Sequence, residues 1–197
     1  MDILEDGRGS GNKAGVTTEN QLLVQSESLP SEGFQAQMGK GFIVHAECHT
    51  DAAASGGLLL IQNLDTIYDY EITRIYIDPH VITPTDLIIT QAFEPSVSNG
   101  SDVSSTAIVQ KNRNTAEDFN LMIKISDGSS NLTYTGGNQY HSFPAKSMTS
   151  VQRDMKGTNI VPANKAMVFG WKTAGGGNAT DGEVVSFSVN LIKRARS

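Results

Sequence analysis

His45, Cys48 and His49 carry the side chains in this sequence that most resemble a set of metal ligands. Side chains alternate along a β-strand, so His45 and His49 share one face of the strand expected here, while Cys48 points to the other. A structural zinc site needs four ligands, and no fourth ligand stands at a recognisable spacing. We therefore expect a strand end with a buried thiol, no metal and no cofactor.

The remaining histidines lack the neighbours that a catalytic base requires. Such a base needs a nucleophile and an oriented acid beside it. His80 lies two residues after Asp78, but no serine stands in the Gly-x-Ser-x-Gly pattern of a nucleophile elbow. His141 follows Tyr140 and precedes Phe143 by two residues, which favours packing. We expect no catalytic residue among them.

Two short polar motifs resemble ligand loops only in part. The Gly-x-Gly-x-Gly run at 7–11 follows no expected strand and opens no expected helix, so it lacks both conditions for holding a phosphate. Asp127, Ser129 and Asn131 place oxygen ligands at alternate positions, as calcium loops do, but the closing glutamate is missing. A polar hairpin turn explains the second motif.

Two groups of side chains keep a role in carbohydrate chemistry open. Glycoside hydrolysis uses a pair of carboxylates that converge from distant strands, and sugar binding often uses an exposed aromatic ring. The same residue types are also ordinary in turns, strand edges and cores. The candidate acids are Asp65, Asp69, Glu71 and Asp78, and the candidate stacking residues are Tyr68, Tyr70, Tyr76 and Trp171.

The charge and composition of the chain argue against several classes of protein. A formal net charge of −6 opposes general binding to nucleic acid, which needs clustered Lys and Arg. The basic run Lys193, Arg194 and Arg196 is typical of a solvated tail. No stretch approaches the ~20 consecutive apolar residues of a membrane helix. One cysteine and no visible secretion signal predict a protein made in a cytoplasm without internal disulfides.

The first 40 residues are expected to form an extended arm and linker, and residues 41–197 a single β-domain. Residues 5–15 hold almost no side chains that could be buried, so they cannot compensate the entropy of their own ordering. Residues 21–26 have the pattern of a short strand, and residues 30–41 that of a linker. Such an arm needs another surface on which to lie.

Short apolar runs alternate with turn residues in the second part, which is typical of a sandwich or barrel. The clearest period of two runs over 183–193, which we expect to form a hairpin with 166–172 across the glycine-rich loop at 175–178. No window keeps a helical period over the ~10 to 12 residues of a typical helix. About eight to ten strands are consistent with an all-β, jelly-roll-like antiparallel sandwich. The other predicted strands are 42–47, 58–63 after a loop with Gly56 and Gly57, 70–77 ended by Asp78 and Pro79, 87–93, and 120–125.

The stretch from Asp6 to Leu22 combines a glycine-rich start with Asn-x-Ala-x-Val and then Asn-x-Leu. Segments 112–119, 127–128, 136–137 and 160–166 continue the likeness. Together they resemble virion proteins of tailed bacteriophages. The resemblance implies a head decoration (cement) protein, or a neck or fibre-base protein, with a jelly-roll body that is frequently a homotrimer. It supplies no catalytic residues, and nothing here resembles a long fibre shaft or a receptor-binding tip.

We therefore expect a non-enzymatic virion protein that works by binding other proteins. Its arm would bind the major capsid protein or another virion protein by strand addition, and its body would self-associate, with a trimer favoured. The alternatives are a neck, tail-accessory or fibre-base protein, a carbohydrate-binding module that contacts host surface glycans, and a hydrolase with dispersed carboxylates. The arm residues expected to contact the partner are Arg8, Ser10, Asn12, Lys13, Val16, Asn20, Leu22, Leu23 and Val24.

Overall fold

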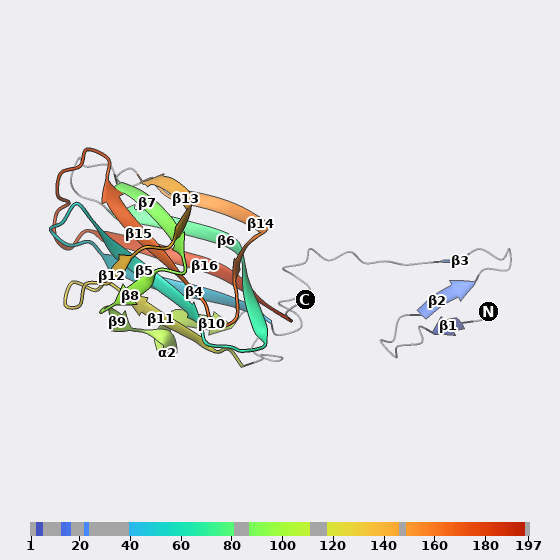
Figure 1. Cartoon of the computed structure of the whole chain (residues 1–197). Helices are drawn as coiled ribbons and strands as arrows, with labels where there is room; N and C mark the ends of the chain where they lie inside the picture. The colour runs from blue at the N-terminus through green and yellow to red at the C-terminus, as the bar shows by residue number, and fades with distance from the viewer. Residues whose placement is uncertain are drawn as a thin grey trace. The chain divides into compact units, whose positions relative to one another are not determined.

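The computed structural model divides the chain into two compact units, Met1–Pro30 and Ser31–Ser197 (Figure 1). In the second unit, two antiparallel sheets enclose a shared apolar core. The residues that the structure describes are 3–5, 13–16, 22–23, 40–80, 87–110, 118–145 and 149–195.

The described part of the first unit is a small antiparallel sheet of three short strands. Its order is β1 (Ile3–Glu5), β2 (Lys13–Val16) and β3 (Leu22–Leu23). In the register, Ile3 is paired with Gly15 and Gly15 with Leu23. β3 lies inside the strand predicted at 21–26, whereas β1 and β2 were not predicted. Backbone pairing, which depends little on side-chain type, accounts for the strand at 13–16.

The second unit contains a five-stranded and a six-stranded sheet. We refer to them as the first and the second sheet. The order in the first sheet is β10 (Ile108–Gln110), β4 (Gly41–His49), β16 (Val184–Ala195), β6 (Tyr68–His80) and β14 (Val151–Val161). The order in the second sheet is β13 (Asn138–Ala145), β7 (Leu87–Phe93), β15 (Ala166–Thr173), β5 (Ser55–Asn63), β11 (Leu121–Ile125) and β9 (Ser101–Asp102).

The strand order confirms the jelly-roll-like sandwich predicted from the sequence. With the segment between β7 and β13 set aside, the first sheet reads β4-β16-β6-β14 and the second reads β13-β7-β15-β5. The chain therefore changes sheets at nearly every step, and its last strand, β16, lies between its first and third, β4 and β6. This winding of two Greek keys is the jelly-roll arrangement.

The predicted hairpin between 166–172 and 183–193 is wrong. The two segments form β15 and β16, but β15 pairs with β5 and β7 in the second sheet, while β16 pairs with β4 and β6 in the first. The glycine-rich connection thus crosses from one sheet to the other. Two consecutive strands with alternating apolar and polar side chains are compatible with a jelly roll as well as with a hairpin, because either arrangement buries one face of each strand.

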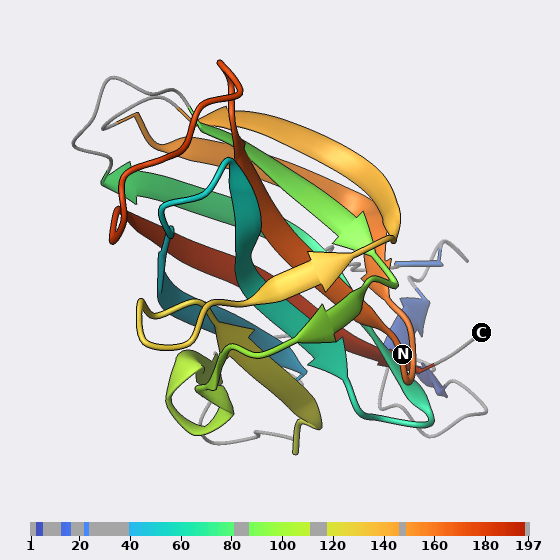
Figure 2. The same ribbon diagram turned by 60° about the vertical axis from the view of Figure 1, so that its left-hand side comes forward.

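An insertion between β7 and β13 thickens one side of the sandwich. It adds β10 beside β4 in the first sheet, and β11 and β9 beyond β5 in the second. It also forms a two-stranded ribbon of β8 (Ser96–Ser98) and β12 (Thr133–Thr135). The ribbon crosses the outside of the second sheet (Figure 2), where Leu132 packs with Leu60 and Val168 in a separate apolar cluster.

Apolar alternation along the strands fills the space between the sheets as predicted. Along β16, Val185, Phe187, Val189 and Leu191 are buried, and the intervening serines lie on the outer face. The ring of Phe187 meets that of Phe169 in β15, with 5.2 Å between the ring centroids. The core is thus closed by one face of each sheet.

One local prediction fails at the end of a strand. β6 runs through Pro79 to His80 instead of ending before it. Its pairing with β14 stops at Ile77. No β14 residue is therefore paired with Pro79, which has no N–H group to donate to a neighbouring strand. The single-turn helix α2 (Ser104–Ala107) was also not predicted, because its four residues are too few to show a helical period of apolar side chains.

Candidate functional site

The Asp78 carboxylate lies between a hydroxyl and an imidazole. Ser150 Oγ donates to Asp78 Oδ1 at 2.7 Å, and His80 Nε2 lies 3.5 Å from Asp78 Oδ2. A serine nucleophile requires the imidazole in the middle, where it can take the hydroxyl proton. In this order, the acid separates the base from the hydroxyl. The cluster therefore forms an exposed polar contact between β6 and the start of β14.

The predicted division of His45, Cys48 and His49 between the faces of one strand is confirmed. All three lie in β4, with Cys48 fully buried in the core and His45 on the outer face, where its Nδ1 is 2.9 Å from Ser188 Oγ. Burial raises the pKa of the Cys48 thiol, which is therefore neutral. Among the described residues, no three His, Cys, Asp or Glu side chains gather to hold a metal ion.

Three of the candidate acids hold the polypeptide in place. Asp65 Oδ1 accepts the backbone N–H of Ile67 at 2.9 Å, and Asp69 Oδ1 accepts that of Ala163 at 2.8 Å. Glu71, which is almost completely buried, forms an ion pair with Arg194, in which Nε and Oε2 are 2.6 Å apart. These carboxylates close turns and tie strand ends together.

The burial of the four aromatic side chains corrects the prediction that all of them could stack against a sugar. Tyr70 and Trp171 are 0% and 1% exposed, so neither ring can offer a face to a ligand. Tyr68 is half-buried, and Lys193 Nζ lies 4.4 Å from its ring centroid, in cation–π contact. Tyr76 alone of the four is exposed, to 37%. Strand position decides this division, because Tyr70 faces the core and Tyr76 the solvent.

The motif at Asp127 closes a tight turn. Asp127 Oδ1 accepts the backbone N–H of Ser129 at 3.0 Å and that of Ser130 at 2.9 Å, and it also accepts the Ser129 hydroxyl at 2.8 Å. Hydrogen bonds from the side chains of Ser101 and Ser129, with those from the backbone, hold the pKa of Asp127 well below its usual range. The carboxylate is thus occupied by its own loop, as predicted for a polar turn.

Nine arm residues were predicted to contact a partner, and the structure describes the backbone of four of them. Lys13 and Val16 lie in β2, and Leu22 and Leu23 form β3. β3 is an outer strand of its sheet, and its second edge has no partner among the described residues. An open strand edge offers unpaired N–H and C=O groups to another chain. Arg8, Ser10, Asn12, Asn20 and Val24 lie outside the described residues.

The two outer faces of the sandwich differ in cover. The ribbon of β8 and β12 lies on the second sheet, where Tyr134 Oη is 3.2 Å from Thr90 Oγ1. On the outer face of the first sheet, the central strand β16 carries the short side chains of Ser186 and Ser188. Tyr76 is exposed on the same face. At the edge of this sheet, residues of β4 and α2 line a cavity of about 290 Å³, among them His45, Glu47 and Thr106.

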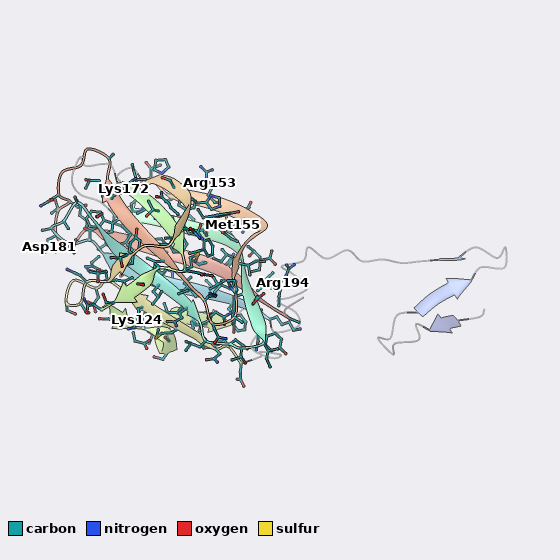
Figure 3. All side chains as sticks on the ribbon, in the orientation of Figure 1. Lys124, Arg153, Met155, Lys172, Asp181 and Arg194 are labelled. Atoms are coloured by element: carbon teal, nitrogen blue, oxygen red, sulfur yellow. The ribbon has the colours of Figure 1, made fainter. Side chains whose placement is uncertain are left out.

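One end of the sandwich displays apolar side chains. Leu64 and Ile67, in the turn from β5 to β6, are 42% and 64% exposed. The same end holds Arg194, labelled in Figure 3, whereas Asp181 lies at the opposite end. This pair was not predicted, because Leu64 and Ile67 lie between the strands predicted at 58–63 and 70–77, and nothing in the sequence shows that their side chains are exposed.

The chain matches no family model and no curated protein sequence. In the described segments, no helix is long and apolar enough to cross a bilayer.

Proposed function

We propose that this chain is a non-enzymatic structural protein of a tailed-bacteriophage virion, and in the first instance a capsid decoration (cement) protein. Its first unit attaches to the major capsid protein or another virion protein, and its jelly-roll body packs against sister copies. The observation that carries the proposal is the open edge of β3 in a unit separate from the sandwich. Such an edge can pair with a strand of another protein.

The chemistry of the described polar groups supports a binding role over catalysis. The carboxylates Asp65, Asp69 and Glu71 are engaged in turns and an ion pair, and Asp78 separates Ser150 from the imidazole beside it. A catalytic group has to meet its substrate with a free proton donor or acceptor. These groups are instead used to hold loops and strands together.

The fold supports the same proposal, though at a coarser level. Jelly rolls form the bodies of viral capsid proteins and of lectins, and one fold serves many functions. In a lattice, many weak contacts of one body act together, because binding at one site raises the effective concentration at the next. A small body with a separate attachment unit is suited to such multivalent binding.

The direct test is to locate the chain on particles. An antibody against residues 40–195 would be used for immunogold labelling of particles of the phage that encodes the chain. Gold distributed over the head is the result expected for a decoration protein. Gold confined to the neck or tail would replace decoration with the neck, tail-accessory or fibre-base alternative. Unlabelled particles from cells that contain the protein would overturn the virion proposal.

A second function, glycan binding, rests on the exposed ring of Tyr76. In the register of the first sheet, Tyr76 stands between Ser188 of β16 and Gln152 of β14, so small and polar neighbours flank the ring. A glycan array would be probed with the wild-type chain and with Tyr76→Ala. The matched control is Tyr140→Ala, since Tyr140 is also an exposed tyrosine but lies in the second sheet. Binding that Tyr76→Ala abolishes and the control retains would support the glycan reading, and silence on all sugars would remove it.

A further inference from the structure

The cavity of about 290 Å³ at the edge of the first sheet lies where a helix takes the place of a strand beside β4, and we call it the α2 cavity. β10 is paired with β4 only at Phe42, Ile43 and Val44. The residues just before β10 form α2, which contacts β4 and β11 (Figure 1). A helical turn cannot continue the ladder of a sheet, so a space remains beside His45 and Glu47.

Hydrogen bonds to β11 fix the wall of the cavity that α2 provides. The N–H of Ile123 donates to Ser104 Oγ at 2.8 Å, and the N–H of Val103 donates to the carbonyl of Ile123 at 2.9 Å. Asp102 Oδ1 accepts the N–H of Ser104 at 2.9 Å and its hydroxyl at 2.6 Å, which holds the start of the helix. The cavity is therefore formed in advance, and a ligand that enters it has little of the chain to order.

One side of the α2 cavity is apolar. Val103, Ala107 and Ile125 line it, and the last two of these belong to the core between the sheets. Hydrocarbon groups that enter such a space leave water, which favours binding. The volume is at the lower limit of ligand pockets, which is about 300 Å³. The cavity therefore suits a short aliphatic chain better than a nucleotide or an oligosaccharide.

The polar side of the cavity carries one carboxylate and, among the described residues that line it, no Lys or Arg. Glu47 is exposed, and its carboxylate forms no ion pair with another residue that the structure describes. Thr106 Oγ1 donates its proton to the carbonyl of Val103 at 3.2 Å, so it offers a ligand only its lone pairs. His45 shares the face of β4 with Glu47, and the 2.9 Å contact of its Nδ1 with Ser188 Oγ orients the ring.

These two sides match the two parts of an alkylammonium ion. The ammonium group has a positive charge and three N–H donors, which suit the carboxylate of Glu47 and the hydroxyl oxygen of Thr106. The aliphatic chain attached to it can lie on the apolar side, as the stem of a lysine does on other apolar surfaces. An anionic ligand would meet the charge of Glu47 as a like charge, and a neutral one would leave that charge unpaired.

We propose that the α2 cavity binds a primary ammonium group on a short aliphatic chain, with Glu47 as its counter-ion and Thr106 as a second acceptor. The ligand is a free aliphatic amine or the side chain of a lysine in another protein, because both present the same chemistry. The site lies wholly within the sandwich. It goes beyond the proposed function, which depends on the first unit.

The first test is an NMR titration of the full-length, ¹⁵N-labelled chain with n-pentylammonium chloride at constant ionic strength. We expect saturable shifts of the amide signals of Glu47, Thr106 and Ala107. The neutral probe 1-pentanol has the same chain length and should bind at least about tenfold more weakly, because it cannot pair with the carboxylate. Equal affinity for the two probes, or no saturable shift at these residues, would overturn the proposal.

Substitutions test the roles of the two acceptors. Glu47→Gln keeps the shape of the side chain, removes its charge and should weaken the binding of n-pentylammonium at least about tenfold. Thr106→Val removes one neutral acceptor and should cost roughly threefold. The matched control is Glu94→Gln, because Glu94 is also exposed but does not line the cavity, and it should bind like the wild type. Wild-type affinity in Glu47→Gln would contradict the assignment.

Two further probes distinguish the sources of the ammonium group. Nα-acetyl-lysine N-methylamide represents a lysine within a protein, and 1,5-diaminopentane represents a free amine. Tighter binding of the lysine derivative would assign the cavity to a partner protein, and tighter binding of the diamine to a free amine. Failure of both to bind would overturn the proposal and leave the labelling of particles, which tests the proposed function, unaffected.

Discussion

Asn159 in β14 donates a hydrogen bond from Nδ2 to Oε1 of Gln91 in β7, 3.2 Å away, and both side chains are fully buried. β14 belongs to the first sheet and β7 to the second, so this bond crosses the core between the sheets. Gln91 Nε2 also contacts Sδ of Met167 at 2.6 Å. A polar joint in an apolar core fixes how two sheets align, because any other alignment leaves both amides without partners.

We predict that Asn159→Leu lowers the free energy of unfolding by about 1–3 kcal/mol, because it leaves the side-chain carbonyl of Gln91 buried and unpaired. The double variant Asn159→Leu, Gln91→Leu removes both polar groups and should lose less stability than the sum of the two single changes. Urea unfolding of the four proteins measures the coupling. Strict additivity would contradict a direct bond between the two side chains.

Gly170→Ala should be destabilising by about 1–3 kcal/mol, because a Cβ at this position would overlap the hydroxyl and ring of Tyr134 in the ribbon over the second sheet. The variant Gly170→Ala, Tyr134→Ala relieves the overlap. We expect its cost to be smaller than the sum of the single substitutions in thermal unfolding. An alanine at 170 that is tolerated beside Tyr134 would show that the ribbon does not pack there.

The hydrogen bonds to Asp127 predict a specific effect of acid. Its pKa is lowered in the folded state, so the group adds stability above its unfolded pKa of about 3.9, and this stability is lost as the pH falls through the folded pKa. In urea unfolding, Asp127→Asn should therefore be less stable than the wild type near neutral pH, and the difference should shrink below about pH 4. Ser129→Ala, which removes one donor, should make this contribution smaller and complete its loss at a higher pH. A difference that stays constant with pH would contradict the assignment.

Trp171→Ala and Tyr76→Ala should differ sharply in stability. Trp171 is in the core, so its truncation should cost about 3–5 kcal/mol. Tyr76 lies on an outer face, where substitutions usually stay within about 0.5 kcal/mol. Chemical unfolding of both variants measures the contrast. Similar losses in the two would show that the exposed ring of Tyr76 also serves the fold.

The fold class could be predicted because each strand carries its own burial pattern. Val185, Phe187 and Val189 alternate with polar residues, and that pattern alone places one face of β16 in a core. The same pattern cannot tell which strand lies alongside, so β15 and β16 were wrongly expected to form a hairpin. Strand ends were equally hidden, since Gly56 and Gly57 belong to β5 although they look like a loop.

The candidate sites were harder to predict, because they depend on contacts between distant residues. Ser150 meets Asp78 across two strands, and nothing in the spacing of the two residues indicates it. Tyr70 and Tyr76 are six residues apart on one strand, yet β6 buries the first and exposes the second. Period-two alternation would place both on one face, and a register irregularity between β6 and β16 at Asn190 and Leu191 separates them.

The most direct measurement of the central claim is the number of copies per particle for the full-length chain and for residues 31–197, supplied in turn to a phage that lacks the gene. Quantitative mass spectrometry of purified particles would give both numbers, with circular dichroism of the truncated chain as the folding control. The proposed role of the first unit predicts normal incorporation of the full-length chain and loss of the folded, truncated one. Equal copy numbers for both would contradict it.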